Sequence, residues 1–178
     1  MRELDHALDQ IREIRSDLER ARVYRGYRAG PTAVTSALAA GTGWLQVVAN
    51  PPLHAVLALW IACAVASAAV IGASMLRRPS PRTREALRCL AWPVLAGALV
   101  TVALFDRAPE LLPGLWQIFY ALALFASLRL LPRGTILVAL FFLTSGLLVL
   151  GSTTALAMAV PFAGGQLVAA WLLDRSHG

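Results

Sequence analysis

Long apolar runs alternate with short polar segments along most of the chain. Six such runs can be drawn, at residues 31–50, 53–76, 87–105, 113–131, 134–150 and 153–173. Most of them reach the ~20 residues that a helix needs to cross ~30 Å of hydrocarbon. The fifth run is short and nearly continuous with the sixth, so five spans is an alternative. Because residues 134–173 are too many for one crossing, we predict a tight hairpin at Gly151 and Ser152.

The composition agrees with a membrane protein. Hydrophobic residues make up 58% of the chain and charged residues 15%, whereas soluble domains are about half apolar and about a quarter charged. We therefore predict an all-α integral membrane protein in three parts. These are a cytoplasmic N-terminal helix with its juxtamembrane segment (1–30), a six-helix transmembrane bundle (31–173) and a cytoplasmic tail (174–178). The first 30 residues contain six acids and no apolar core of a signal peptide, so no cleaved signal is expected.

The arginines predict the orientation. If the N-terminus is cytoplasmic, 15 of the 16 basic residues fall on the inner side, and only Arg107 lies outside. Cytoplasmic loops are rich in basic residues, so we expect both termini in the cytoplasm of a bacterium and the bundle in its inner membrane. An even number of spans is required, which supports six. The net charge of +6 then indicates attraction to anionic lipid headgroups and not binding to nucleic acid.

The chain begins with a charged segment that has an apolar seam. Apolar residues alternate at spacings of 3 and 4, the a and d positions of a coiled coil: Leu4, Ala7, Ile11, Ile14, Leu18 and Ala21. Three interpretations are open for residues 1–23. The helix pairs with its copy in a homo-oligomer, it binds a cytoplasmic protein or the inner loop near residues 77–88, or it lies on the membrane surface.

A second pattern follows this seam. Arginine and tyrosine alternate without acids just before the first span, as in membrane-interface anchors: Arg22, Tyr24, Arg25, Tyr27 and Arg28. We expect the rings at headgroup level and the guanidinium groups on lipid phosphates.

These N-terminal residues carry a resemblance. Ile14-Arg15, Leu18-Glu19-Arg20 and Tyr24 are similar to the I-R-x-x-M-E-R-x-x-x-Y pattern of a group of predicted bacterial multi-pass membrane proteins, with Leu18 in the place of Met. The resemblance covers the N-terminal helix and, by hydropathy only, the spans. It implies a multi-pass bundle and transfers neither a function nor site residues.

Small residues predict where helices approach closely. Five alanines lie on one stripe of the second span: Ala58, Ala62, Ala66, Ala69 and Ala73. A shorter stripe on the first span contains Ser36, Ala40 and Gly43. We expect these faces to pack within the bundle, with a subunit interface as the alternative. Trp44 and Trp60 are expected between helices.

Candidate chemistry within the spans is sparse. Three amides, Gln46, Gln117 and Gln166, could line a small polar pocket or bond neighbouring helices. Pro93 and Pro161 are expected to break the third and sixth spans, in similar strings that fit an inverted repeat. No ionisable residue is predicted deep in a span, which counts against a proton pump or ion channel. No catalytic motif occurs, so we expect no enzyme, cofactor or metal site.

The sequence thus predicts a non-enzymatic inner-membrane protein. Its N-terminal helix would mediate oligomerisation or dock a cytoplasmic, possibly regulatory, partner. The alternative is a small-solute transporter or channel subunit built around the proline-interrupted third and sixth spans.

Overall fold

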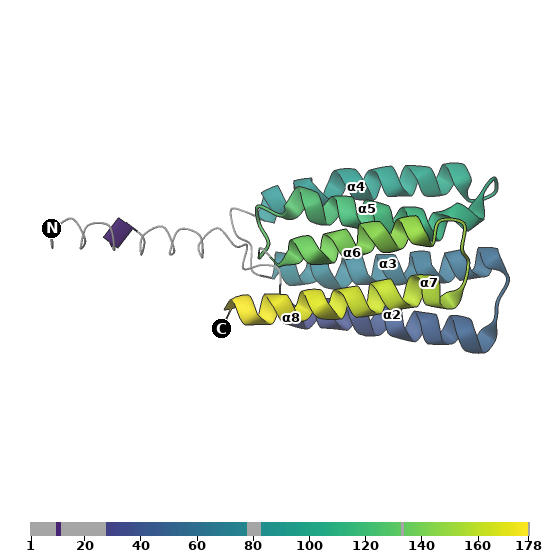
Figure 1. Cartoon of the computed structure of the whole chain (residues 1–178), viewed down its shortest axis with the longest axis horizontal. Coiled ribbons are helices and arrows are strands. Elements are labelled where there is room, and N and C mark those ends of the chain that lie inside the picture. The colour runs from purple at the N-terminus through teal and green to yellow at the C-terminus, as the bar shows by residue number, and fades with distance from the viewer. Residues whose placement is uncertain (1–9, 12–27, 78–82, 133, 178) are drawn as a thin grey trace.

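The computed structural model describes residues 10–11, 28–77, 83–132 and 134–177, and these contain helices and no strand. The helices lie side by side (Figure 1). Their bounds are α2 Ala29–Ala49, α3 Leu53–Leu76, α4 Thr83–Leu104, a 3₁₀ turn η1 Pro109–Leu111, α5 Leu112–Ser127, α6 Thr135–Leu148, α7 Ala155–Ala159, a π-helical turn η2 Val160–Gly164 and α8 Gly165–His177. The all-helical prediction is therefore confirmed.

Four segments are long and apolar enough to cross a membrane, at Leu53–Leu76, Leu87–Leu104, Pro109–Ser127 and Ala155–Arg175. The other two predicted spans are present as helices, but one is too short and the other is not apolar enough to be counted with these four. Helix α6 has 14 residues, roughly 21 Å at 1.5 Å per residue. Helix α2 has 21 residues, and its threonines, Ser36 and Gln46 lower its mean hydropathy. Six crossings thus remain a prediction.

Two tight connections turn the chain back at the same end of the bundle (Figure 1). After α2, Asn50 adopts a left-handed conformation with φ 40°, and Pro51 and Pro52 prevent the helix from continuing. After α6, Gly151 has φ +83°, a conformation that glycine adopts without the usual steric cost. The hairpin predicted at Gly151 and Ser152 is present.

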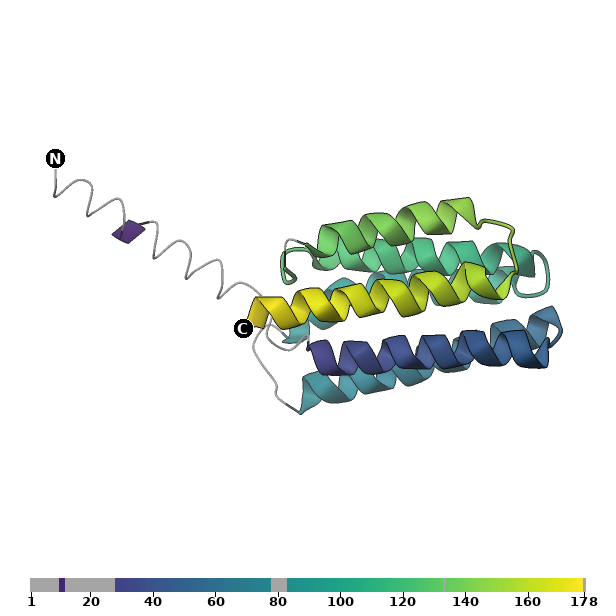
Figure 2. The same cartoon turned by 60° about the horizontal axis from the view of Figure 1, so that its bottom comes forward.

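The bundle is built around pairs of neighbouring helices. Helix α5 packs between α4 and α6, while α2 packs against α3, α7 and α8. Figure 2 shows α8 lying between α2 and α6, so that the C-terminal segment joins the two groups. Helix α8 continues to His177, four residues beyond the predicted end of the sixth span at residue 173.

Helix α2 is polar inside and apolar outside. Its buried residues are Thr32, Thr35, Ser36, Ala39, Gly43 and Gln46, and its exposed residues include Val34, Leu38, Val47 and Val48. Lipid is as apolar as leucine, so exposure of aliphatic side chains costs nothing there, and small or polar residues serve the helix contacts. The predicted stripe is correct for Ser36 and Gly43, but Ala39 replaces Ala40, which is exposed.

The alanine stripe of the second span does not pack within the described chain. All five alanines, from Ala58 to Ala73, are exposed, so our prediction of packing inside the bundle is wrong. Helix α3 lies at the edge and inserts larger side chains instead, namely Val56, Leu57, Trp60 and Met75. A subunit interface on the alanine stripe remains a prediction.

The tryptophans divide in a similar way. Trp60 is 4% exposed and lies between helices as predicted, whereas Trp44 is 67% exposed, so its predicted burial is wrong. Trp44 falls on the outward face of α2, opposite the buried polar residues. The buried residues of α2 are mostly small or polar, and the large ring of Trp44 lies on the opposite, outward face.

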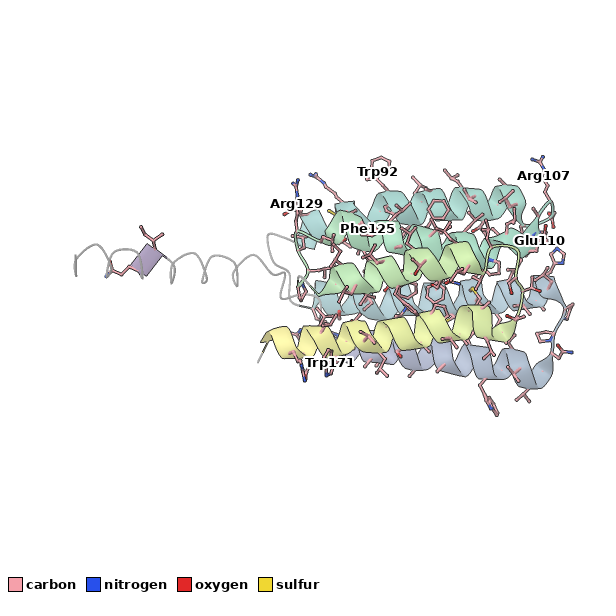
Figure 3. All side chains as sticks on the ribbon, viewed as in Figure 1. Trp92, Arg107, Glu110, Phe125, Arg129 and Trp171 are labelled. Atoms are coloured by element: carbon pink, nitrogen blue, oxygen red, sulfur yellow. The ribbon has the colours of Figure 1, made fainter. Side chains whose placement is uncertain are left out.

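The charged side chains gather at the two ends of the bundle. Arg129 lies at one end and Arg107 and Glu110 at the other (Figure 3). By their helix positions, the remaining arginines with a described side chain share the end of Arg129: Arg28, Arg77, Arg88 and Arg175. We call this the arginine end. Of the arginines whose side chains are described, five thus lie at one end and Arg107 lies at the other.

Candidate functional site

Gln117 of α5 forms the centre of the most buried polar group in the described bundle. Its side chain is 0% exposed. Its Nε2 donates to the Ala157 carbonyl oxygen at 2.8 Å and, more weakly, to the Pro113 carbonyl oxygen at 3.3 Å. Its Oε1 accepts from the Ser145 Oγ of α6 at 2.7 Å. One amide therefore links α5, α6 and α7.

The bond to Ala157 compensates for Pro161. In an α-helix, the carbonyl of residue 157 would accept from the N–H of residue 161, but proline has none. Pro161 also lies in the π-helical turn η2, one of the known causes of irregularity in helices. The Gln117 amide thus satisfies a carbonyl that the proline leaves without its normal donor.

Close backbone contact surrounds this amide. A Cβ added at Gly114 would lie 2.7 Å from the Gly146 carbonyl oxygen, and one added at Gly146 would lie 2.8 Å from the Gly114 carbonyl oxygen. Real Cβ atoms do not approach oxygen so closely, so glycine is required at both positions. This pair of glycines lets α5 and α6 touch, which brings Ser145 within reach of Gln117. Our sequence analysis did not single out either glycine, although their small size is the signal that could have found them.

The other two predicted amides lie elsewhere. Gln46 of α2 accepts from the Trp60 indole Nε1 of α3 at 2.9 Å. Gln166 of α8 is 7% exposed, and its Oε1 has no hydrogen-bond partner among the described residues. No hydrogen bond joins any two of these three glutamines within the described part of the chain. Their placement favours links between helices over one shared pocket.

The α2 serine supplies a further link. Ser36 Oγ donates to the Ala163 carbonyl oxygen of η2 at 2.6 Å. About two turns further along α2, Gly43 faces the Ala159 Cβ so closely that no side chain fits on it. Helix α2 therefore packs directly against the irregular segment that contains Pro161.

Aromatic rings fill the middle of the bundle. Phe162 lies next to three rings from three other helices. Its centroid is 5.3 Å from that of Phe142, 5.7 Å from that of Tyr120 and 5.9 Å from that of Trp60. Tyr120 and Phe142 are in edge contact at 4.6 Å. Such edge and tilted contacts add to the stability gained from burial, and they make this region a packed core.

Pro93 has a different setting. Helix α4 runs through it from Thr83 to Leu104 without interruption, so the break expected there is absent. None of the residues of Leu87–Leu104 is buried, and α4 packs mainly on α5. Its one polar link within the described residues runs from Trp116 Nε1 to Thr101 Oγ1 at 2.8 Å. Pro93 and Pro161 therefore do not line a common space.

The N-terminal predictions lie mostly outside the described residues. Of the seam positions, only Ile11 is described; it is helical and 60% exposed. Leu4, Ala7, Ile14, Leu18 and Ala21 lie outside. Of the arginine and tyrosine anchor, Arg28 is described, directly before α2, and Arg22, Tyr24, Arg25 and Tyr27 lie outside.

Comparisons of the chain with protein-family models, with curated proteins and with solved structures give no match. The chemistry of the described residues must therefore be read from their own geometry.

Proposed function

We propose that this chain is a non-enzymatic protein of the bacterial inner membrane whose N-terminal helix mediates oligomerisation or docks a cytoplasmic partner such as a regulator. In this proposal six helices cross the membrane and both termini are cytoplasmic. The bundle holds the helix in place and does no chemistry of its own.

The observation that carries the proposal is the apolar seam of residues 4–21. Six apolar positions at alternating spacings of 3 and 4 need a surface to cover them, because an exposed apolar stripe on a soluble helix is unfavourable. Ile11 is consistent with this, since it is helical and its side chain is 60% exposed in the single chain. A second copy or a partner helix would bury it.

The bundle supports a scaffold role. Gln117 ties three helices together, and four aromatic side chains occupy the centre. The five described arginines at one end fit a cytoplasmic face by the bias of cytoplasmic segments toward basic residues. Because α2 begins at that end, residues 1–28 would enter the cytoplasm from there.

The transporter alternative receives less support from the described residues. It requires that the third and sixth spans line one pathway. Instead α4 packs on α5 at the edge, while the Pro161 segment packs on α2 and α6. We therefore keep it as the second candidate without a geometric argument in its favour.

Deletion of residues 1–23 tests the proposal. The purified full-length protein and the deletion variant are compared by mass determination in detergent and by capture of partners from a cytoplasmic extract. We expect the deletion to lower the mass of the assembly or to abolish capture of a specific partner. The proposal fails if both the mass and the captured proteins are unchanged while the variant still inserts in the membrane.

A further inference from the structure

A groove runs along the surface between α2 and α8, close to the arginine end. It has a volume of about 530 Å³, and all of its lining residues except Asp174 are apolar. Gly30 and Ala33 form its α2 side, and Leu167, Val168 and Trp171 form its α8 side, with Asp174 at the end nearest the chain's C-terminus. A Cβ added at Gly30 would meet no atom within 4 Å. The small residues of α2 thus leave open space beside the larger side chains of α8.

This groove lies at the outer surface of the bundle and not in its interior. Leu167 is 58% exposed and Trp171 51% exposed. Figure 3 shows Trp171 toward the arginine end of α8. In a membrane, an apolar groove on the outer surface of the bundle faces the lipid acyl chains. Its volume is within the range of roughly 300–1,000 Å³ over which proteins bind small molecules.

Positive charge is concentrated where the groove ends. The Arg175 guanidinium lies over the Trp171 ring, 4.0 Å from its centroid, an arrangement that fixes the cation by attraction to the ring face. Arg28 directly precedes Ala29, another residue of the groove wall. No acid is present in the first turn of α2. Among the described residues, Asp174 is the one carboxylate that lines the groove, and Arg28 and Arg175 adjoin its lining residues along the chain, so the described charges at this end are two arginines and one acid.

We propose that this groove binds one anionic phospholipid of the surrounding bilayer. An acyl chain lies along Ala33 and Leu167, and the phosphate is held between Arg28 and Arg175. Arginine is suited to phosphate because its planar guanidinium donates two parallel hydrogen bonds. Trp171 is placed at the boundary between the two environments, where its ring is favoured. The acyl chain thus contacts the apolar wall of the groove, and the anionic headgroup contacts the arginines at its end.

The inference is independent of the proposed docking role of the N-terminal helix. It depends on residues 28–33 and 167–175 only, and it stands whether or not residues 1–23 bind a partner. If the groove bound a zwitterionic lipid or free phosphate instead, the experiment below would give different results.

Native mass spectrometry of the full-length protein tests the proposal. The protein is delipidated in detergent and mixed with dioleoylphosphatidylglycerol, dioleoylphosphatidylethanolamine or inorganic phosphate. We expect one phosphatidylglycerol to be retained at concentrations where phosphatidylethanolamine is lost, and excess inorganic phosphate should not displace it. Double substitution Arg28→Gln and Arg175→Gln should weaken retention by about tenfold or more, since each charge-assisted hydrogen bond contributes strongly.

Two matched controls separate this site from general attraction to lipid. Arg107→Gln removes an arginine at the opposite end and should leave retention unchanged. Gly30→Leu fills the groove and should abolish retention of the lipid, whereas Gly41→Leu makes the same change on α2 outside it. Gly41 also has no atom within 4 Å of an added Cβ, so both glycine variants should fold, as circular dichroism would verify. Equal retention of the two lipids, or equal retention by Gly30→Leu and Gly41→Leu, would overturn the proposal.

Discussion

Pro93 and Pro161 lie in two strings of similar sequence, "AWPVLAGALVTVALF" and "AVPFAGGQLVAAWLL", yet their surroundings differ. Pro93 lies within a continuous α4 at the edge of the bundle. Pro161 lies in a π-helical turn at the centre, where Gln117 serves the carbonyl that the proline leaves without its donor. Similar strings therefore place proline in two different surroundings: α4 continues through Pro93, whereas the carbonyl that Pro161 leaves without its donor accepts from Gln117.

The same contrast separates the core from the edge as a whole. At the centre, glycines at 114 and 146 bring α5 and α6 into backbone contact, and polar side chains link three helices. At the edge, none of the residues of Leu87–Leu104 is buried. Within a bilayer, association depends on close packing and hydrogen bonds because lipid offers no hydrophobic driving force. Substitutions should therefore have large effects at the centre and small effects on α4.

The largest effect is expected from Gly114→Ala. The new methyl group would lie 2.7 Å from the Gly146 carbonyl oxygen and 3.0 Å from the Leu150 Cα, and backbone atoms cannot move aside alone. We expect the free energy of unfolding, measured by SDS titration in mixed micelles, to fall by about 1–3 kcal/mol. Gly97→Ala on α4 is the matched control. The atoms nearest to its Cβ would be those of Phe119, at an ordinary contact distance of 3.6 Å, so an equal loss in both variants would contradict the contrast between core and edge.

A somewhat smaller effect is expected from Gln117→Leu, which removes the donor to the Ala157 carbonyl and the acceptor for Ser145. The loss should be about 1–2 kcal/mol. In a Pro161→Ala background the restored backbone N–H can donate to that carbonyl, so the loss from Gln117→Leu should shrink by about 1 kcal/mol.

Pro93→Ala provides the control background for this double-mutant experiment. In that background the loss from Gln117→Leu should be unchanged, because no hydrogen bond connects Gln117 with α4 among the described residues. Identical losses in the Pro161→Ala and wild-type backgrounds would show that Gln117 does not compensate for the proline.

The smallest effect is expected from Trp60→Phe. This change keeps a ring next to Phe162 but removes the indole N–H that donates to Gln46 at 2.9 Å. Hydrogen bonds between membrane helices contribute about 0.6 kcal/mol on average, and we expect a loss of that size in the same titration. Trp92→Phe should cost nothing measurable, since Trp92 is 73% exposed. A loss for Trp92→Phe as large as that for Trp60→Phe would count against this assignment.

Hydropathy predicted the helices and the hairpin at Gly151, because the cost of unpaired backbone groups in lipid forces apolar runs to become helices. It could not predict which face of each helix is buried. Inside a bilayer, large apolar side chains are equally stable facing lipid, so the alanines of α3 and Trp44 of α2 point outward although packing was expected.

The candidate site was predicted in part. Sequence reasoning selected Gln46, Gln117 and Gln166 because amides are costly in hydrocarbon without partners. It could not assign their partners, since the carbonyl of Ala157 lies 40 residues from Gln117 along the chain and lacks its usual backbone donor only because of Pro161. Gly114 is the one glycine of the predicted run 113–131, and Gly146 is one of two glycines in the run 134–150. Only the crossing of α5 and α6 shows that these two glycines face each other.

The central claim is that the seam of the N-terminal helix, and not the bundle, makes the contact with a second copy or partner. Its most direct measurement compares Ile14→Asp with Ser16→Asp by mass determination and partner capture. Each variant adds one carboxylate, and the two positions are two residues apart, but the heptad pattern predicts position 14 on the seam and position 16 farthest from it. We predict that Ile14→Asp loosens the assembly or loses the partner while the bundle stays inserted, and that Ser16→Asp behaves as wild type. Unchanged mass and capture for Ile14→Asp, or equal losses in both variants, would contradict the claim.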